Sequence, residues 1–141
     1  MLYLTRREVF SASHRLYNEK YTDEENEKIF GKCSNPNGHG HNYVLEVVVA
    51  GEADHETGYV VDLKILKEII DKHVLKKVDH KNLNVDVDFL KGINPTVENI
   101  AIGIWNQLED KIPRGRLYSV KVKETENNFV EYKGRNEIEF R

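Results

Sequence analysis

The sequence predicts an α+β fold, an antiparallel sheet with a helix pair on one face. Two early segments, residues 2–14 and 41–50, are rich in the β-branched and aromatic residues that favour strands. Two later segments, residues 62–76 and the stretch after Pro95, carry apolar residues at helical spacing. A hairpin pattern ends the chain, so the expected order is strand, strand, helix, helix, strand, strand.

A short helix over about residues 22–30 is predicted between the first two strands. Thr22 and Glu25 have the spacing of a capping box, and Gly31 is a suitable residue just past a helix end. In the second strand, residues 41–50, every other side chain shares one face: His41, Tyr43, Leu45, Val47 and Val49. The apolar face of this strand therefore begins with a histidine.

Each of the two longer helices has its own start signal. Asp62 is a good N-cap for a helix over residues 62–76, in which Leu63, Leu66, Ile69, Ile70, His73 and Val74 follow helical spacing. Pro95 and Thr96 begin the second helix, whose apolar face consists of Ile100, Ala101, Ile104, Trp105 and Leu108. A polar loop over residues 78–84 is expected to follow the first of these helices.

The last part of the chain predicts a hairpin. One strand covers residues 117–125, and its partner contains Phe129, Val130 and Tyr132. We find no linker, repeat or low-complexity tract, so a single domain is expected over residues 1–141.

Composition sets further limits on the class of protein. The 141 residues carry a formal net charge of −3, which gives no reason to expect binding to nucleic acid or to a membrane. No stretch approaches the roughly 20 apolar residues of a membrane span, and the N-terminus lacks the pattern of a secretory signal. A single cysteine cannot form an internal disulfide, which is typical of a reducing, cytoplasmic location.

Three histidines are candidates for a metal site. His39 and His41 are two residues apart, so in an extended segment both imidazoles point to the same side. Antiparallel pairing of the first two strands would place His14 beside them. Three imidazoles with an open position form the catalytic type of zinc site, although they also accept other divalent ions. The competing interpretation is that they are ordinary structural or surface histidines, which is the interpretation we adopt for His55 and His73.

Four other polar residues are candidates for chemistry. Cys33 is either a buried structural thiol or, in its polar, turn-rich surroundings, a base or nucleophile. Asp79 and His80 are an adjacent carboxylate–imidazole pair in a polar loop. Glu124 lies near the end of a predicted strand, where it is either solvated or a bidentate partner for a guanidine-like edge of a ligand.

Five motifs, in order, resemble those of the 6-pyruvoyl-tetrahydropterin synthase family over nearly the whole chain. They are Phe-Ser-Ala-Ser-His at 10–14, Cys-x5-His-Gly-His at 33–41, Val-Asp-His-Lys-Asn-Leu at 78–83, Pro-Thr-x-Glu-Asn at 95–99 and Glu-Thr-x-Asn-Asn at 124–128. The resemblance implies the tunnelling fold, a ββααββ unit that assembles into an oligomeric barrel. It also implies a homohexamer of two stacked trimers, with active sites between subunits.

The resemblance further implies an activity and a set of roles. The expected reaction eliminates triphosphate from 7,8-dihydroneopterin triphosphate and, after an internal redox shift, leaves a pyruvoyl side chain. By resemblance, Zn²⁺ is held by His14, His39 and His41. Cys33 is expected to remove a carbon-bound proton, with Asp79 and His80 as its relay across a subunit boundary. Glu124 is expected to bind the pterin through its 2-amino and N3 hydrogens. Thr96 is a second candidate pterin contact, although a helix N-cap explains it equally well.

Three alternatives remain open from the sequence. A sister enzyme, 6-carboxytetrahydropterin synthase of queuosine biosynthesis, uses the same substrate and zinc but also releases acetaldehyde. Its bacterial members typically have a shorter Cys-x3-His-Gly-His spacing, whereas five residues separate Cys33 from His39 here. A non-catalytic pterin-binding or metal-binding module, and a zinc hydrolase that tolerates loss of Cys33, are the other two.

Overall fold

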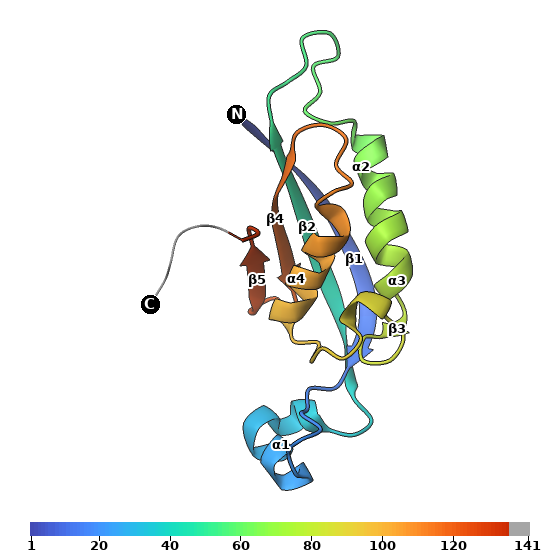
Figure 1. The fold of residues 1–141 in the computed structure, drawn as a ribbon, viewed down its shortest axis with the longest axis vertical. Coiled ribbons are helices and arrows are strands. Elements are labelled where there is room, and N and C mark those ends of the chain that lie inside the picture. Colours follow the sequence, from blue (N-terminus) through green and yellow to red (C-terminus); the bar gives the residue numbers. More distant parts are fainter. Residues whose placement is uncertain (136–141) are drawn as a thin grey trace.

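A computed structural model describes residues 1–135, in which one five-stranded sheet carries helices on one face (Figure 1). The strand order is β3-β1-β2-β4-β5. The strands are β1 (Leu2–His14), β2 (His39–Gly51), β3 (Lys81–Asn82), β4 (Arg116–Lys123) and β5 (Phe129–Tyr132). The main helices are α1 (Asp23–Phe30), α2 (Leu63–Ile70), α3 (Lys76–Val78) and α4 (Val97–Leu108). None of the helices in this part of the chain has the length and apolar character that crossing a membrane requires.

The predicted α+β class is confirmed, with one addition to the sheet. All neighbouring strands pair antiparallel except β3, which pairs parallel to the end of β1. The expected loop over residues 78–84 is therefore partly a strand. His80 N–H donates to the Ser11 carbonyl (2.6 Å) and Leu83 N–H donates to the Ser13 carbonyl (2.8 Å), so this segment occupies the free edge of β1.

The core lies between the sheet and the helices. The predicted apolar face of β2 is buried, since Tyr43, Leu45, Val47 and Val49 are each 0% exposed. The expected apolar face of α4 belongs to the same core, with Ile100, Ala101, Ile104 and Leu108 also 0% exposed. His41 lies on the same face of β2 at the edge of this core, so the alternation that buries the strand also directs this histidine inward.

The predicted helix boundaries are close to those in the structure. Thr22 caps α1 with both hydrogen bonds of a capping box, and Asp62 and Thr96 cap α2 and α4. The helix expected over residues 62–76 continues through a π-helical segment (Asp71–Leu75) into α3. After α1, the expected stop at Gly31 leads into a short 3₁₀ helix (Gly31–Ser34) that contains Cys33.

The pairing register of β1 and β2 brings His14 close to His39 and His41. His14 pairs directly with His39, and Ala12 pairs with His41. The second strand begins at His39, two residues earlier than predicted. Gly38 makes this possible because its φ is +72° and a Cβ there would lie 2.9 Å from the His14 carbonyl oxygen.

Replacing Gly38 with alanine is expected to destabilise the protein more than the same change at Gly92. Both glycines have a positive φ, near +72° and +76°, and alanine in that region costs about 1–2 kcal/mol. A Cβ added at Gly92 would meet no atom within 4 Å, whereas Gly38→Ala must also displace the His14 carbonyl. Urea unfolding of both variants measures the difference, and equal midpoints would contradict the close approach of the two strands.

Candidate functional site

Three histidines meet where β1 ends and β2 begins. His14 Nε2 and His39 Nε2 are 3.1 Å apart, and one ring nitrogen from each of His14, His39 and His41 lies within 4.8 Å of the others. The His14 side chain is buried, and the other two are partly exposed. The structure therefore brings together the three residues that the sequence predicted as metal ligands.

The nitrogen atoms of this cluster fit a bound cation. The Pro95 carbonyl can only accept a hydrogen bond, so His14 Nδ1, 2.8 Å away, carries the proton and Nε2 keeps its lone pair facing His39. His41 Nε2 and His39 Nδ1 are buried without a hydrogen-bond partner. Such orphan nitrogens are costly unless something binds them, and a metal that His14, His39 and His41 share would satisfy the one on His41.

Burial keeps this site in the form that a metal needs. Desolvation lowers the pKa of His14 and of His41, so both imidazoles are neutral near neutral pH. The hydroxyl of Tyr43, which is 3.4 Å from His14 Nδ1, stays protonated. Burial first, then the nearby Glu124 carboxylate and Cys33, raise the pKa of Tyr43.

A carboxylate faces the three histidines. Glu124 follows β4, and its oxygens lie 3.8 Å from His41 Nε2 and 4.0 Å from His14 Nε2. Its side chain is only 22% exposed, so it is not the freely solvated strand-end residue that was the competing interpretation. The sequence showed that Glu124 lies near the end of a strand, but it did not show that the side chain points toward the histidines.

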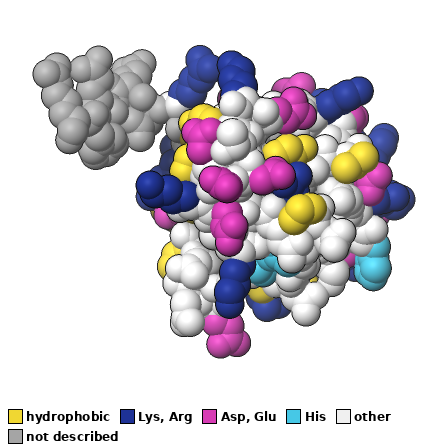
Figure 2. Space-filling view, turned by 90° about the horizontal axis from the view of Figure 1, so that it is seen from below, with side chains coloured by type: hydrophobic (Ala, Val, Ile, Leu, Met, Phe, Trp, Pro, Cys, Tyr) yellow, Lys and Arg dark blue, Asp and Glu magenta, His cyan; other side chains and the backbone are white. Residues whose placement is uncertain are grey.

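The segment that carries Cys33 lies against the chain just after His14. The half-buried Cys33 belongs to the turn Gly31–Ser34, and its carbonyl accepts a hydrogen bond from Leu16 N–H (2.8 Å). The thiol is thus on the side of the molecule where β1 ends. Seen from that end, basic and acidic side chains are intermingled over the surface, without a large field of one sign (Figure 2).

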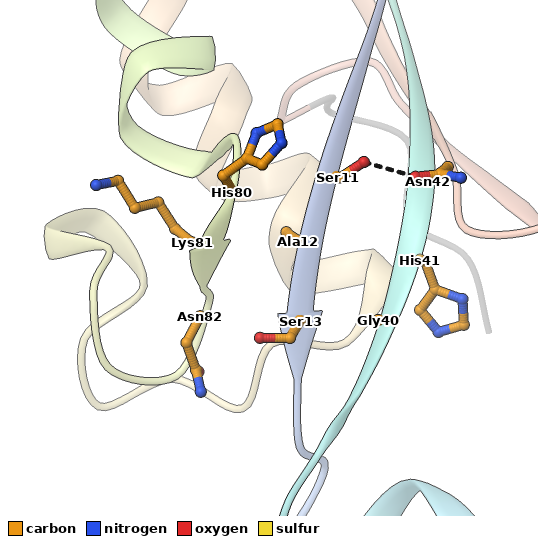
Figure 3. Close-up of a pocket in the computed structure, with 9 residues that line it drawn as sticks. All are labelled: Ser11, Ala12, Ser13, Gly40, His41, Asn42, His80, Lys81 and Asn82. Atoms are coloured by element: carbon orange, nitrogen blue, oxygen red, sulfur yellow. Dashed lines mark hydrogen bonds between the residues drawn. The ribbon is translucent and has the colours of Figure 1, made fainter.

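Asp79 and His80 form a pair but lie apart from the histidine cluster. His80 Nδ1 is 3.1 Å from Asp79 Oδ1, and the other contact of that oxygen is Ser11 N–H at 2.9 Å. This backbone hydrogen bond is the main reason that the pKa of Asp79 is lowered. The rings of His80 and His41 lie on opposite sides of the β1–β2 pair (Figure 3). Among the described residues, no hydrogen bond or ion pair joins the Asp79–His80 pair to the three histidines, although His41 and His80 both border one hollow.

His80 borders a hollow of about 410 Å³ on the sheet. Ser11, Asn42 and Lys81 also line it, and Ser11 Oγ donates to Asn42 Oδ1 (Figure 3). His80 is 82% exposed and adopts a φ of +61°, which is uncommon for a residue with a side chain. Its ring is therefore accessible to another molecule.

The remaining candidate, Thr96, acts as a helix cap. Its Oγ1 accepts a hydrogen bond from Asn99 N–H (3.2 Å), so the structural interpretation is confirmed. The neighbouring Pro95 is the residue that sequence reasoning missed, because it acts through its backbone carbonyl, which no side-chain pattern reveals. Tyr43 was also missed as a site residue, although it shares the alternating face of β2 with His41.

Fold and site together define a class: an α+β protein with three imidazoles placed to hold a metal ion. A family model described as "6-pyruvoyl tetrahydropterin synthase" matches residues 3–135. The chain is an enzyme of the 6-pyruvoyl tetrahydropterin synthase family, as the sequence resemblance indicated.

Named relatives are similar in sequence to this chain over most of their own length. The chain is 52% identical to a Homo sapiens protein named 6-pyruvoyl tetrahydrobiopterin synthase, over 93% of this chain and 90% of that protein. A Dictyostelium discoideum protein with the same name is 55% identical, over 93% and 95%. The solved Caenorhabditis elegans 6-pyruvoyl tetrahydropterin synthase superposes with a TM-score of 0.90 at 45% identity, covering 95% of this chain and 96% of that one. A Rickettsia typhi protein named 6-carboxy-5,6,7,8-tetrahydropterin synthase is 31% identical, over 93% and 99%.

The metal-free protein is expected to lose stability as the pH falls below about 6.5. Because burial lowers the pKa of His14 from its usual 6.5, the unfolded chain binds a proton there that the folded protein does not. The stabilisation is therefore complete above that pH and declines below it. Urea unfolding at pH 5, 6 and 7.5 tests this. His14→Gln should flatten the pH dependence, and the exposed His55→Gln should leave it unchanged. A wild-type profile that is flat, or that rises toward pH 5, would contradict the buried neutral histidine.

Proposed function

We propose that this chain is a single-domain, zinc-dependent lyase that converts 7,8-dihydroneopterin triphosphate to 6-pyruvoyl-tetrahydropterin with elimination of triphosphate. The observation that supports this most directly is the cluster of His14, His39 and His41, with free ring nitrogens converging beside Glu124. Relatives at 52% and 55% identity named 6-pyruvoyl tetrahydrobiopterin synthase support the same reaction.

His14, His39 and His41 would hold the metal, and a set of three imidazoles suits Zn²⁺. When bound, the ion supplies Lewis-acid chemistry, which acidifies the proton on the carbon next to a coordinated hydroxyl. The Pro95 carbonyl fixes the tautomer and ring orientation of His14, as outer partners of metal-bound histidines commonly do.

Cys33 as a thiolate would remove the acidified proton from the substrate side chain. It sits in a turn hydrogen-bonded to the residues just after His14, so base and metal are held by adjoining pieces of chain. Asp79 would orient His80 for proton return, through the 3.1 Å contact between Oδ1 and Nδ1.

Glu124 and Thr96 would contact the pterin. A carboxylate can accept two parallel hydrogen bonds, which matches the 2-amino and N3 hydrogens of a pterin ring. Among the described residues, Glu124 accepts no hydrogen bond from another side chain apart from its contacts with the histidines, so its oxygens are available for such an edge. Thr96 Oγ1 is committed to capping α4 and would add a contact only through its hydroxyl proton.

The decisive experiment is a product assay with dihydroneopterin triphosphate and the zinc-loaded protein. We expect release of triphosphate and formation of the pyruvoyl pterin, without acetaldehyde. Stoichiometric acetaldehyde would replace the proposal with 6-carboxytetrahydropterin synthase. Relatives with the pyruvoyl name are closer than the one with the carboxy name, 52–55% against 31% identity, which favours the first outcome.

Cys33→Ala is the matched control for that assay. Loss of a positioned base typically costs about 10²–10⁴-fold in rate, so triphosphate release should fall accordingly while the zinc content stays the same. Unchanged release would show that the thiol is not the base and would favour a hydrolase that uses metal-bound water. No release by the wild-type protein, with pterin still bound, would instead favour a binding module.

We also propose that the active site is completed by a neighbouring subunit within a homohexamer of two stacked trimers that forms a barrel. The observation behind this is the separation of the Asp79–His80 pair from the histidine cluster of the same chain, together with its exposure. Strands β3 and β5 form the two edges of the sheet and are available to pair with other copies.

Mixing two inactive variants tests the shared site. Cys33→Ala and His80→Ala each lack one part of the machinery, but a mixed oligomer can contain an intact Cys33 beside an intact His80 from another chain. We expect activity after co-refolding that neither variant has alone. If both residues act within one chain, the mixture will stay as inactive as its components.

A further inference from the structure

The short segment that follows β1 connects the metal site to the turn that carries Cys33. Arg15 and Leu16 come directly after His14, and both donate to that turn. Leu16 N–H donates to the Cys33 carbonyl (2.8 Å), and Arg15 Nε donates to the Ser34 carbonyl (2.9 Å). Two consecutive residues thus hold two consecutive carbonyls, so the position of the thiol relative to His14 is determined by this segment.

Arg15 is held in place through both its side chain and its backbone. Its guanidinium carbon lies 4.0 Å from the centre of the Tyr17 ring, a stacked cation–π contact. Its backbone is clamped by Asn84, which accepts from Arg15 N–H (2.7 Å) and donates to the Arg15 carbonyl (2.8 Å). Within residues 1–135, no carboxylate oxygen lies within 4.0 Å of this guanidinium, unlike that of Arg6 or Arg114.

The turn itself has few other restraints at this point. Ser34 Oγ donates to the Gly31 carbonyl (2.8 Å), which closes the turn internally but does not tie it to the sheet. Gly31, the first residue of the turn, is exposed and has a positive φ of +59°. The hydrogen bonds from Arg15 and Leu16 therefore connect the turn to β1, and only the one from Arg15 depends on the identity of a side chain.

We propose that Arg15 is a positioning residue that holds the Cys33 turn at a defined distance from His14. This inference rests on the proposed role of Cys33 as the base. Arginine suits the task because its planar group donates through Nε while it stacks on Tyr17, and the ammonium of lysine cannot do both. Small displacements of a reacting group can cost on the order of 10²-fold in rate, so a side chain that touches no substrate can still control turnover.

Arg15→Lys tests the proposal, with Arg7→Lys as the matched control on the exposed face of β1. We expect kcat to fall by about 10-fold or more, with KM and zinc content unchanged. A fall in zinc content would show that Arg15 supports the metal site instead. A rise in KM at unchanged kcat would show that it binds the substrate. Either result, or an unchanged kcat when Cys33→Ala is inactive, overturns the proposal.

The reactivity of Cys33 provides a readout that does not depend on catalysis. Cys33 is the only cysteine, so the rate of alkylation by iodoacetamide at fixed pH reports on this turn alone. Arg15→Lys should raise that rate about threefold because the turn is released and the thiol becomes more accessible. Tyr17→Leu, which removes only the stacking partner, should raise it by a smaller factor. Alkylation at the wild-type rate in both variants overturns the proposal.

The two proposals fail in different ways. If Cys33→Ala keeps full activity while Arg15→Lys still accelerates alkylation, the role of Cys33 as base is wrong but the positioning contact is supported. If Cys33→Ala is inactive and Arg15→Lys changes neither kcat nor alkylation, the proposed reaction stands and the role of Arg15 is wrong.

Discussion

The antiparallel register of β1 and β2 is the constraint on which the site depends. It pairs His14 with His39 and Ala12 with His41, so the three imidazoles converge at one end of the sheet. Because the side-chain direction alternates along a strand, a shift of one residue would turn His14 away from its partners. The same register brings Arg15 and Leu16 to the turn of Cys33, so the three histidines and the thiol are positioned together.

The apolar core and the polar site share one face of the sheet. Tyr43, Leu45, Val47 and Val49 of β2 form a buried layer that continues directly into His41 and His14. Burial there has two consequences, since it lowers the pKa of His14 and of His41 and leaves ring nitrogens without a hydrogen-bond partner. Both are unfavourable for an isolated histidine and favourable for a metal ligand. The core therefore helps to define the chemistry of the site as well as the stability of the fold.

The fold also separates groups that the chemistry would have to bring together. The Asp79–His80 pair sits beside the edge strand β3, held there by backbone contacts with Ser11, and faces outward. Glu124, in contrast, comes from beyond β4 and turns inward to the histidines. The sequence placed the Asp79–His80 pair in a polar loop and Glu124 near a strand end, yet the two end in opposite environments.

The sequence by itself determined the strands, the capped helices, the buried face of β2 and the three histidines as a candidate cluster. These depend on alternation, helical spacing and caps, which are properties of residues a few positions apart. Only the tertiary structure decided that Pro95, 81 residues from His14, accepts its Nδ1 proton, that Glu124 faces the cluster, and that Arg15 holds the Cys33 turn. Such contacts depend on register and on the packing of distant segments, and a local pattern contains no information about which distant atom will complete a hydrogen bond.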